Sequence, residues 1–137
     1  MSTHSPRHRA REIALQFLYG NEDLATNLEM ELKRHFEHFS VPEDTRDFAT
    51  QLVLGTLREK ASLDELLEKH VSNWKISRLS FVDRNLLRMA VYEMLHFPDT
   101  SPSIVIDEAI ELGKQFGTSE TPAFINGVLD AVKAAVR

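Results

Sequence analysis

Apolar residues recur at intervals of three and four along almost the whole chain, and no segment alternates with the two-residue period of a strand. The first such stripe holds Ala10, Ile13, Ala14, Phe17 and Leu18, and Leu15 and Tyr19 widen it. A stripe this broad predicts a central, buried helix. Ser5 followed by Pro6 predicts where that helix begins, and Gly20-Asn21 predicts where it ends.

The same spacing predicts six further helices, within about residues 28–39, 48–56, 62–71, 80–95, 105–116 and 121–132. Ser62-Leu63-Asp64-Glu65 has the form of a capping box, Ser80 is a second candidate cap, and Gly117 is placed as a C-terminal cap. Thr121-Pro122 predicts the start of the last helix. We therefore predict an all-α fold of about seven helices in two packed bundles, about residues 5–72 and 76–137, divided near Trp74.

Length and composition narrow the class of protein. The 137 residues, 42% of them apolar, suit one domain or two small subdomains that share a core. The absence of cysteine excludes disulfides, thiol catalysis and zinc sites built on cysteine. No run approaches the roughly 20 apolar residues of a membrane span, and the start lacks the apolar run of a secretory signal. We expect a cytoplasmic protein that does not enter a membrane.

Charge is distributed unevenly. Residues 1–11 carry Arg7, Arg9 and Arg11 and no Asp or Glu, a formal charge of +3. The rest of the chain has 13 Lys+Arg against 21 Asp+Glu, a formal charge of −8. Arginine suits phosphate oxygens and stacks on bases, and positive side chains in a first helical turn oppose the helix dipole. The cluster is either an ordinary basic terminus or an arm that binds nucleic acid, and the unfavourable dipole favours the arm.

Catalytic and metal-binding motifs are missing. His4 and His8 at i, i+4, and His35 and His38 at i, i+3, could each share a helical face, but no third ligand accompanies them. Surface histidines are therefore the better interpretation. All five glycines are isolated, so the sequence has no phosphate-binding loop. We expect neither enzymatic activity nor a metal or other cofactor.

Two polar features inside helical segments remain. Asn126-Gly127 interrupts an apolar run, and glycine in a helix interior costs about 1 kcal/mol relative to alanine. Close approach of another helix is the usual explanation, and Asn126 would then bond across that contact or face a ligand. Asp83 and Glu93 lie on the polar side of the predicted fifth helix, and solvated charge is favoured there over a docking face.

Several blocks of the sequence together resemble the NusB family of transcription antitermination factors. They are Arg9-Ala10-Arg11-Glu12 with Ala14-Leu15-Gln16 and Leu18-Tyr19, Asp83-Arg84 with the segment 87–95, the segment 105–112 with Lys114 and Phe116-Gly117, and the segment 124–130. The match runs nearly end to end, and the last two blocks are the most specific. The resemblance implies a helical fold of two packed bundles.

The resemblance also implies a function. Proteins of this family bind the boxA element of ribosomal-RNA leader transcripts together with NusE, a small-subunit ribosomal protein, and help RNA polymerase to read through terminators. Carried to matching positions, Arg7, Arg9 and Arg11 would contact RNA, as would Glu120 and Phe124. Tyr19 and Asp83 would face NusE. His8 interrupts the basic run, and Pro122-Ala123 stands where relatives can carry His-Lys.

Two alternatives stay open. NusB-like domains also occur at the front of RNA methyltransferases, but no cofactor-binding segment follows here before Arg137, so a standalone factor is expected. A purely structural helical adaptor or homodimer, with no RNA binding, is the rival class of function. The free protein could also form a homodimer without losing RNA binding.

Overall fold

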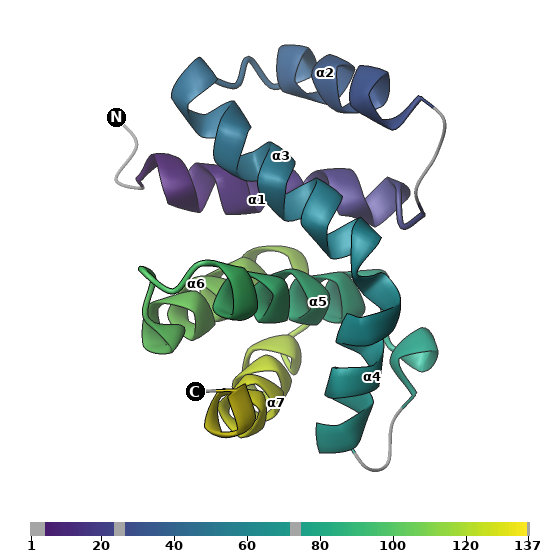
Figure 1. The fold of residues 1–137 in the computed structure, drawn as a ribbon, viewed down its shortest axis with the longest axis vertical. Helices are drawn as coiled ribbons and strands as arrows, with labels where there is room; N and C mark the ends of the chain where they lie inside the picture. Colours follow the sequence, from purple (N-terminus) through teal and green to yellow (C-terminus); the bar gives the residue numbers. More distant parts are fainter. Residues whose placement is uncertain (1–4, 24–26, 72–74, 137) are drawn as a thin grey trace. The chain divides into compact units, whose positions relative to one another are not determined.

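The computed structural model describes residues 5–23, 27–71 and 75–136. Within these ranges the regular elements are the helices α1 (Pro6–Gly20), α2 (Leu28–His38), α3 (Glu43–Arg58), α4 (Lys60–His70), α5 (Phe81–His96), α6 (Pro102–Phe116) and α7 (Thr121–Val136), and the 3-10 helix η1 (Ile76–Arg78) (Figure 1). The predicted all-α fold is confirmed. Trp74 and His4 lie outside the described residues.

Three of the four predicted helix caps are present in the structure. The Ser5 hydroxyl accepts a hydrogen bond from the amide of His8 at 3.1 Å, and Ser80 caps α5 in the same way. Gly117 is the C-cap of α6, as predicted. The predicted capping box at Ser62 is wrong, because α4 begins at Lys60 and the Ser62 hydroxyl instead donates to the carbonyl of Glu59 at 3.0 Å.

The chain forms two compact units, divided between Arg58 and Glu59. In the first unit α3 crosses α1 and packs on it (Figure 1), and α2 also contacts α1. The predicted stripe of α1 is buried, but Tyr19 is exposed. Its core includes the fully buried side chains of Ile13, Leu18 and Leu52.

Histidine helps to join α2 to α1 in this unit. His35 Nε2 donates to the carbonyl of Ile13 at 3.0 Å, and its ring meets Phe17 and Phe39 edge-on. Burial lowers the pKa of His35, and the bond to Ile13 only partly opposes this shift. His8 is buried and His35 is half-buried, so the interpretation of the histidines as surface residues is wrong for His8.

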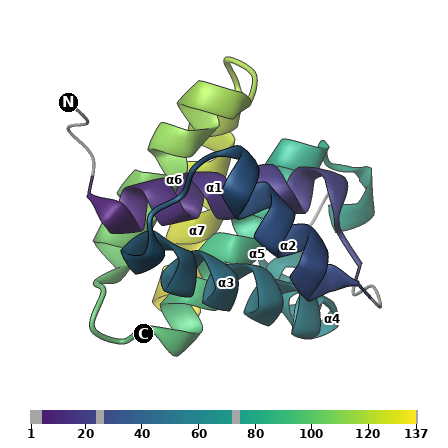
Figure 2. The same ribbon diagram turned by 90° about the horizontal axis from the view of Figure 1, so that it is seen from above.

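The second unit contains α4, η1, α5, α6 and α7. The last three helices pack against one another, and Figure 2 shows α6 beside α7. The core holds the fully buried side chains of Leu86, Leu87, Leu112 and Leu129. No helix in the described part of the chain is long and apolar enough to cross a membrane.

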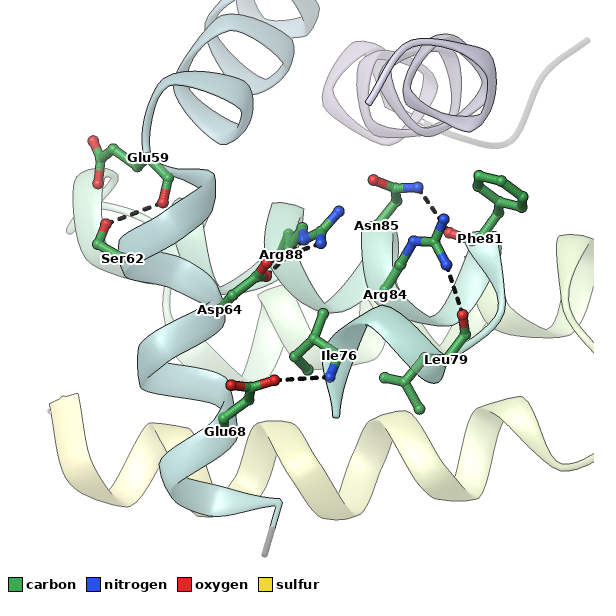
Figure 3. Close-up of polar contacts among 10 residues, drawn as sticks. All are labelled: Glu59, Ser62, Asp64, Glu68, Ile76, Leu79, Phe81, Arg84, Asn85 and Arg88. Atoms are coloured by element: carbon green, nitrogen blue, oxygen red, sulfur yellow. Dashed lines mark hydrogen bonds and ion pairs between the residues drawn. The ribbon is translucent and has the colours of Figure 1, made fainter. Parts of the chain in front are cut away.

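Side-chain bonds explain why α4 belongs to the second unit. Arg88 on α5 donates from Nε and Nη2 to the two carboxylate oxygens of Asp64, at 2.7 and 2.9 Å (Figure 3). Glu68 accepts the backbone amide of Ile76 at 3.0 Å, which holds η1 beside α4. We expected the division after residue 72, but the structure has it at residue 58, because α4 packs on α5 and α7.

Gly127 does not serve the close helix packing predicted for it. The residue is exposed, and a Cβ built there meets no heavy atom of another element within 4 Å among the described residues. Asn126 is exposed as well, and so forms no buried bond across a helix contact. The glycine is therefore not required by the packing within this chain.

Gly127→Ala is accordingly expected to stabilise the second unit by up to about 1 kcal/mol, because alanine loses less backbone entropy in a helix. Thermal unfolding followed by circular dichroism measures the effect. Gly117→Ala is the matched control, since its Cβ would lie 2.4 Å from Thr121 Oγ1 and should destabilise by at least about 1 kcal/mol. A loss of stability in Gly127→Ala would contradict the open space found around a Cβ at this position.

Candidate nucleic-acid interface

The start of α1 presents arginine on an aromatic support. The guanidinium carbon of Arg7 lies 4.1 Å from the ring centroid of Phe48, and Arg7 is exposed. Phe48 belongs to α3 and is buried. A cation over an aromatic face is attracted by the ring quadrupole, so Phe48 restricts where the Arg7 charge can lie. The exposed charge is thus held in place by the core of the first unit.

The other two arginines differ from Arg7 and from each other. Arg9 is partly exposed and forms an ion pair with Glu12 one turn along α1. Arg11 is only 4% exposed, and its guanidinium carbon lies 5.4 Å from the same Phe48 ring. A phosphate can reach Arg7 and Arg9, whereas Arg11 lacks that access. The sequence pattern treats the three as equivalent, and their burial separates them.

Tyr19 lies at the opposite end of the same helix. Its side chain is 57% exposed. Twelve residues separate it from Arg7, which corresponds to about 18 Å along a helix axis. The structure therefore does not gather Tyr19 with the arginines, and the first unit offers two distinct exposed features, one at each end of α1.

Glu120 and Phe124 lie in the second unit, at the start of α7. Glu120 is exposed in the turn before the helix, Phe124 is half-buried in the first turn, and the Phe124 amide donates to the Glu120 carbonyl at 3.2 Å. The structure therefore brings these two predicted residues together. The arginines belong to the other unit.

Asp83 lies closer to this turn than its place in the sequence indicates. Its Oδ1 accepts a hydrogen bond from Thr121 Oγ1 at 2.9 Å, across 38 residues. Asp83 is half-buried and Glu93, on the same helix, is almost completely buried, so the interpretation of both as solvated charges is wrong for Glu93. Among the described residues no three histidine, aspartate or glutamate side chains gather in a way that could hold a metal ion.

Phe48 and Thr121 are the residues that sequence reasoning missed as parts of a site. The sequence pattern places Phe48 in the helix predicted over residues 48–56, and Thr121 at the start of the last predicted helix. Both assignments are confirmed, since Phe48 lies in α3 and α7 begins at Thr121. Phe48 also contacts Arg7 and Arg11, which lie 41 and 37 residues away, and Thr121 bonds Asp83, which lies 38 residues away. Local sequence patterns do not predict contacts over such distances along the chain.

Comparison with known proteins adds independent evidence. The model of the NusB family matches residues 8–134. The transcription antitermination protein NusB of Desulforapulum autotrophicum is 44% identical over 133 residues, covering 93% of this chain and 90% of that protein.

Two solved structures have the same fold. NusB of T. maritima superposes with a TM-score of 0.81 at 30% identity, covering 96% of this chain and 93% of that one. A crystal structure of the antitermination factors NusB and NusE in complex with dsRNA also gives 0.81, at 29% identity, covering 95% of this chain and 97% of that one. Matched by the family model over nearly its whole length, the chain belongs to the NusB family.

Proposed function

We propose that this protein binds boxA-type RNA of ribosomal-RNA leader transcripts jointly with NusE, and so promotes read-through by RNA polymerase in the cytoplasm. The protein acts as an adaptor and not as an enzyme. Support comes from the family to which the chain belongs and from the solved relative described as a complex of NusB and NusE with dsRNA. The remaining support comes from the geometry of the two units.

The observation that carries the proposal is the pair of solvent-accessible arginines at the start of α1, Arg7 exposed and Arg9 partly exposed. Arg7 is fixed over Phe48 and Arg9 lies two residues on, in a stretch without carboxylates up to residue 11. The amide groups at a helix N-terminus add a positive partial charge there. Two oriented arginines at such a terminus suit the phosphates of a single RNA strand.

The turn before α7 supplies the second proposed contact. The half-buried ring of Phe124 offers a face on which a base can stack. The carboxylate of Glu120 can accept from the amino group of a base, but it repels phosphate. This contact therefore selects for unpaired bases, while the arginines provide the charge attraction.

The acidic remainder of the chain suits a basic ribosomal protein. A formal charge of −8 outside residues 1–11 attracts a positively charged partner and repels RNA. Tyr19, exposed at the end of α1, is the type of side chain that dominates protein interfaces, and Asp83 supplies charge in the second unit. NusE then brings its own RNA contacts, and the joined contacts bind more tightly than either alone.

A titration of labelled boxA RNA with this protein, with NusE and with an equimolar mixture tests the proposal. We expect the mixture to bind at least about tenfold more tightly than either protein, since the second contact becomes intramolecular. A scrambled RNA of equal length is the control for charge attraction alone. Equal affinities for the single protein and the mixture would contradict joint binding.

The rival function is that of a structural adaptor or homodimer without RNA. Light scattering of the protein mixed with NusE, with and without boxA RNA, distinguishes the two. The proposed function requires the mass of the complex to rise by that of the RNA. A dimer whose mass does not change with RNA would support the rival.

A further inference from the structure

Thr121 packs into a small depression, here called the glycine notch, formed by Gly113 of α6 and by Gly117, the C-cap of α6. Its side chain is 2% exposed. A Cβ on Gly117 would lie 2.6 Å from the Thr121 Cβ, and a Cβ on Gly113 would lie 3.0 Å from Thr121 Cγ2. Gly113 and Gly117 are one helical turn apart, so both face Thr121. The first residue of α7 therefore packs closely against the end of α6. A side chain at Gly117 would displace Thr121, and a Cβ at Gly113 would require a smaller adjustment.

The hydroxyl of Thr121 connects α5 to the turn that precedes α7. It donates to Asp83 Oδ1 at 2.9 Å and accepts the amide of Thr118 at 3.1 Å. The Thr118 hydroxyl in turn lies 3.3 Å from the amide of Glu120, from which it accepts. A continuous chain of hydrogen bonds thus runs from the Asp83 carboxylate to the backbone of Glu120.

We propose that Thr121 is a positioning residue that transmits the state of Asp83 to the RNA-facing turn at Glu120 and Phe124. This inference rests on the proposed function, in which Asp83 meets a basic protein and the turn meets RNA. A carboxylate accepts several hydrogen bonds, so a cationic group of the partner can bind Asp83 while Thr121 keeps its own bond. A cation bound to Asp83 then fixes the carboxylate that holds Thr121 and the turn, and the two ligands bind cooperatively.

The coupling predicts an effect opposite in sign to that of simple charge. If Asp83 acted on RNA only through its negative charge, its removal would strengthen RNA binding. If Asp83 acts by holding Thr121, its removal weakens RNA binding even when no partner protein is present. Asp83→Asn separates the two explanations, because asparagine removes the charge and keeps an oxygen that accepts from Thr121.

The experiment measures boxA RNA affinity of the protein alone and with NusE for five forms: wild type, Asp83→Asn, Asp83→Ala, Thr121→Val and the double variant Asp83→Ala/Thr121→Val. Valine fills the glycine notch but has no hydroxyl, and Thr121→Ser is added to restore the hydroxyl without the methyl. We expect Asp83→Ala and Thr121→Val each to weaken binding by the protein alone about three- to tenfold, the range expected for one hydrogen bond. The double variant should be no weaker than either single variant.

Rescue and amide exchange complete the test. In the protein alone, Thr121→Ser and Asp83→Asn should bind RNA within about twofold of wild type, and Thr121→Val should accelerate hydrogen exchange at the amide of Thr118. Additive losses in the double variant, or full affinity in Thr121→Val, would overturn the coupling while leaving RNA binding intact. Failure of the wild type to bind boxA RNA in the mixture would overturn the proposed function itself, and the exchange result would still report whether the hydroxyl holds the turn.

Discussion

Asp64→Ala is expected to lower the free energy of unfolding by about 3 kcal/mol. Alanine removes both charge-assisted bonds to Arg88, whose side chain is 7% exposed and has little access to water. Asp64 itself is 26% exposed, so the reverse change at Arg88 should cost less, because the remaining carboxylate can be hydrated. The two substitutions differ in cost because Arg88 is more deeply buried than Asp64.

Urea unfolding monitored by circular dichroism measures this loss, and the thermal midpoint should fall by about 10 °C. Glu65→Ala is the matched control, since Glu65 neighbours Asp64 on α4 and is exposed; its effect should lie within about 0.5 kcal/mol. Asp64→Asn keeps an acceptor and should fall between the two. If Asp64→Ala and Glu65→Ala unfold at the same urea concentration, the Arg88 pair does not hold α4 to α5.

Arg7→Ala combined with Arg9→Ala is expected to weaken boxA RNA binding by the mixture with NusE about 10- to 100-fold. Each arginine that contacts a phosphate of single-stranded RNA contributes about 0.7 to the slope of log affinity against log salt, so the slope should flatten by about 1.4. Both side chains reach solvent at the start of α1, and Phe48 holds Arg7 in place. The loss should be largest at low salt, where the contacts to phosphate are strongest.

Two single variants show whether the effect is local. Arg34→Ala removes a well-exposed arginine from α2 in the same unit, and its salt slope should match that of wild type. Arg11→Ala should lower the stability of the fold and shift the Arg7 side chain, because both arginines contact Phe48. It should change the slope of log affinity against log salt only little, because Arg11 is buried. An unaltered slope in the Arg7/Arg9 double variant would remove both residues from the RNA site.

The helical class, most helix boundaries and three of the caps could be predicted from local pattern. The capping bonds of Ser5, Ser80 and Gly117 involve backbone groups within one helical turn. Such short-range interactions can be predicted from neighbouring residues in the sequence. Ser62 has an equally good cap motif, yet α4 begins two residues before it. The Ser62 hydroxyl donates to the Glu59 carbonyl within the first turn and so does not cap the helix.

The candidate site was predictable only in part. The charge of the first eleven residues and the family resemblance drew attention to Arg7, Arg9 and Arg11, but not to the difference between them. Burial depends on which side chains cover a residue from another helix, here Phe48 of α3 over Arg11. The same limit applies to Gly127 and Gly117, two helix-associated glycines of which only the second meets another element.

By itself, the sequence determined an all-helical chain of the NusB family with a basic start and an acidic remainder, because periodicity, composition and motif order are properties of the chain. Tertiary structure alone decided which arginines meet solvent, that α4 joins the second unit, and that Asp83 accepts a hydrogen bond from Thr121 at the start of α7. The physical reason is distance along the chain. Hydrogen bonds across 24 residues, as between Arg88 and Asp64, or across 38, as between Asp83 and Thr121, arise only when helices pack.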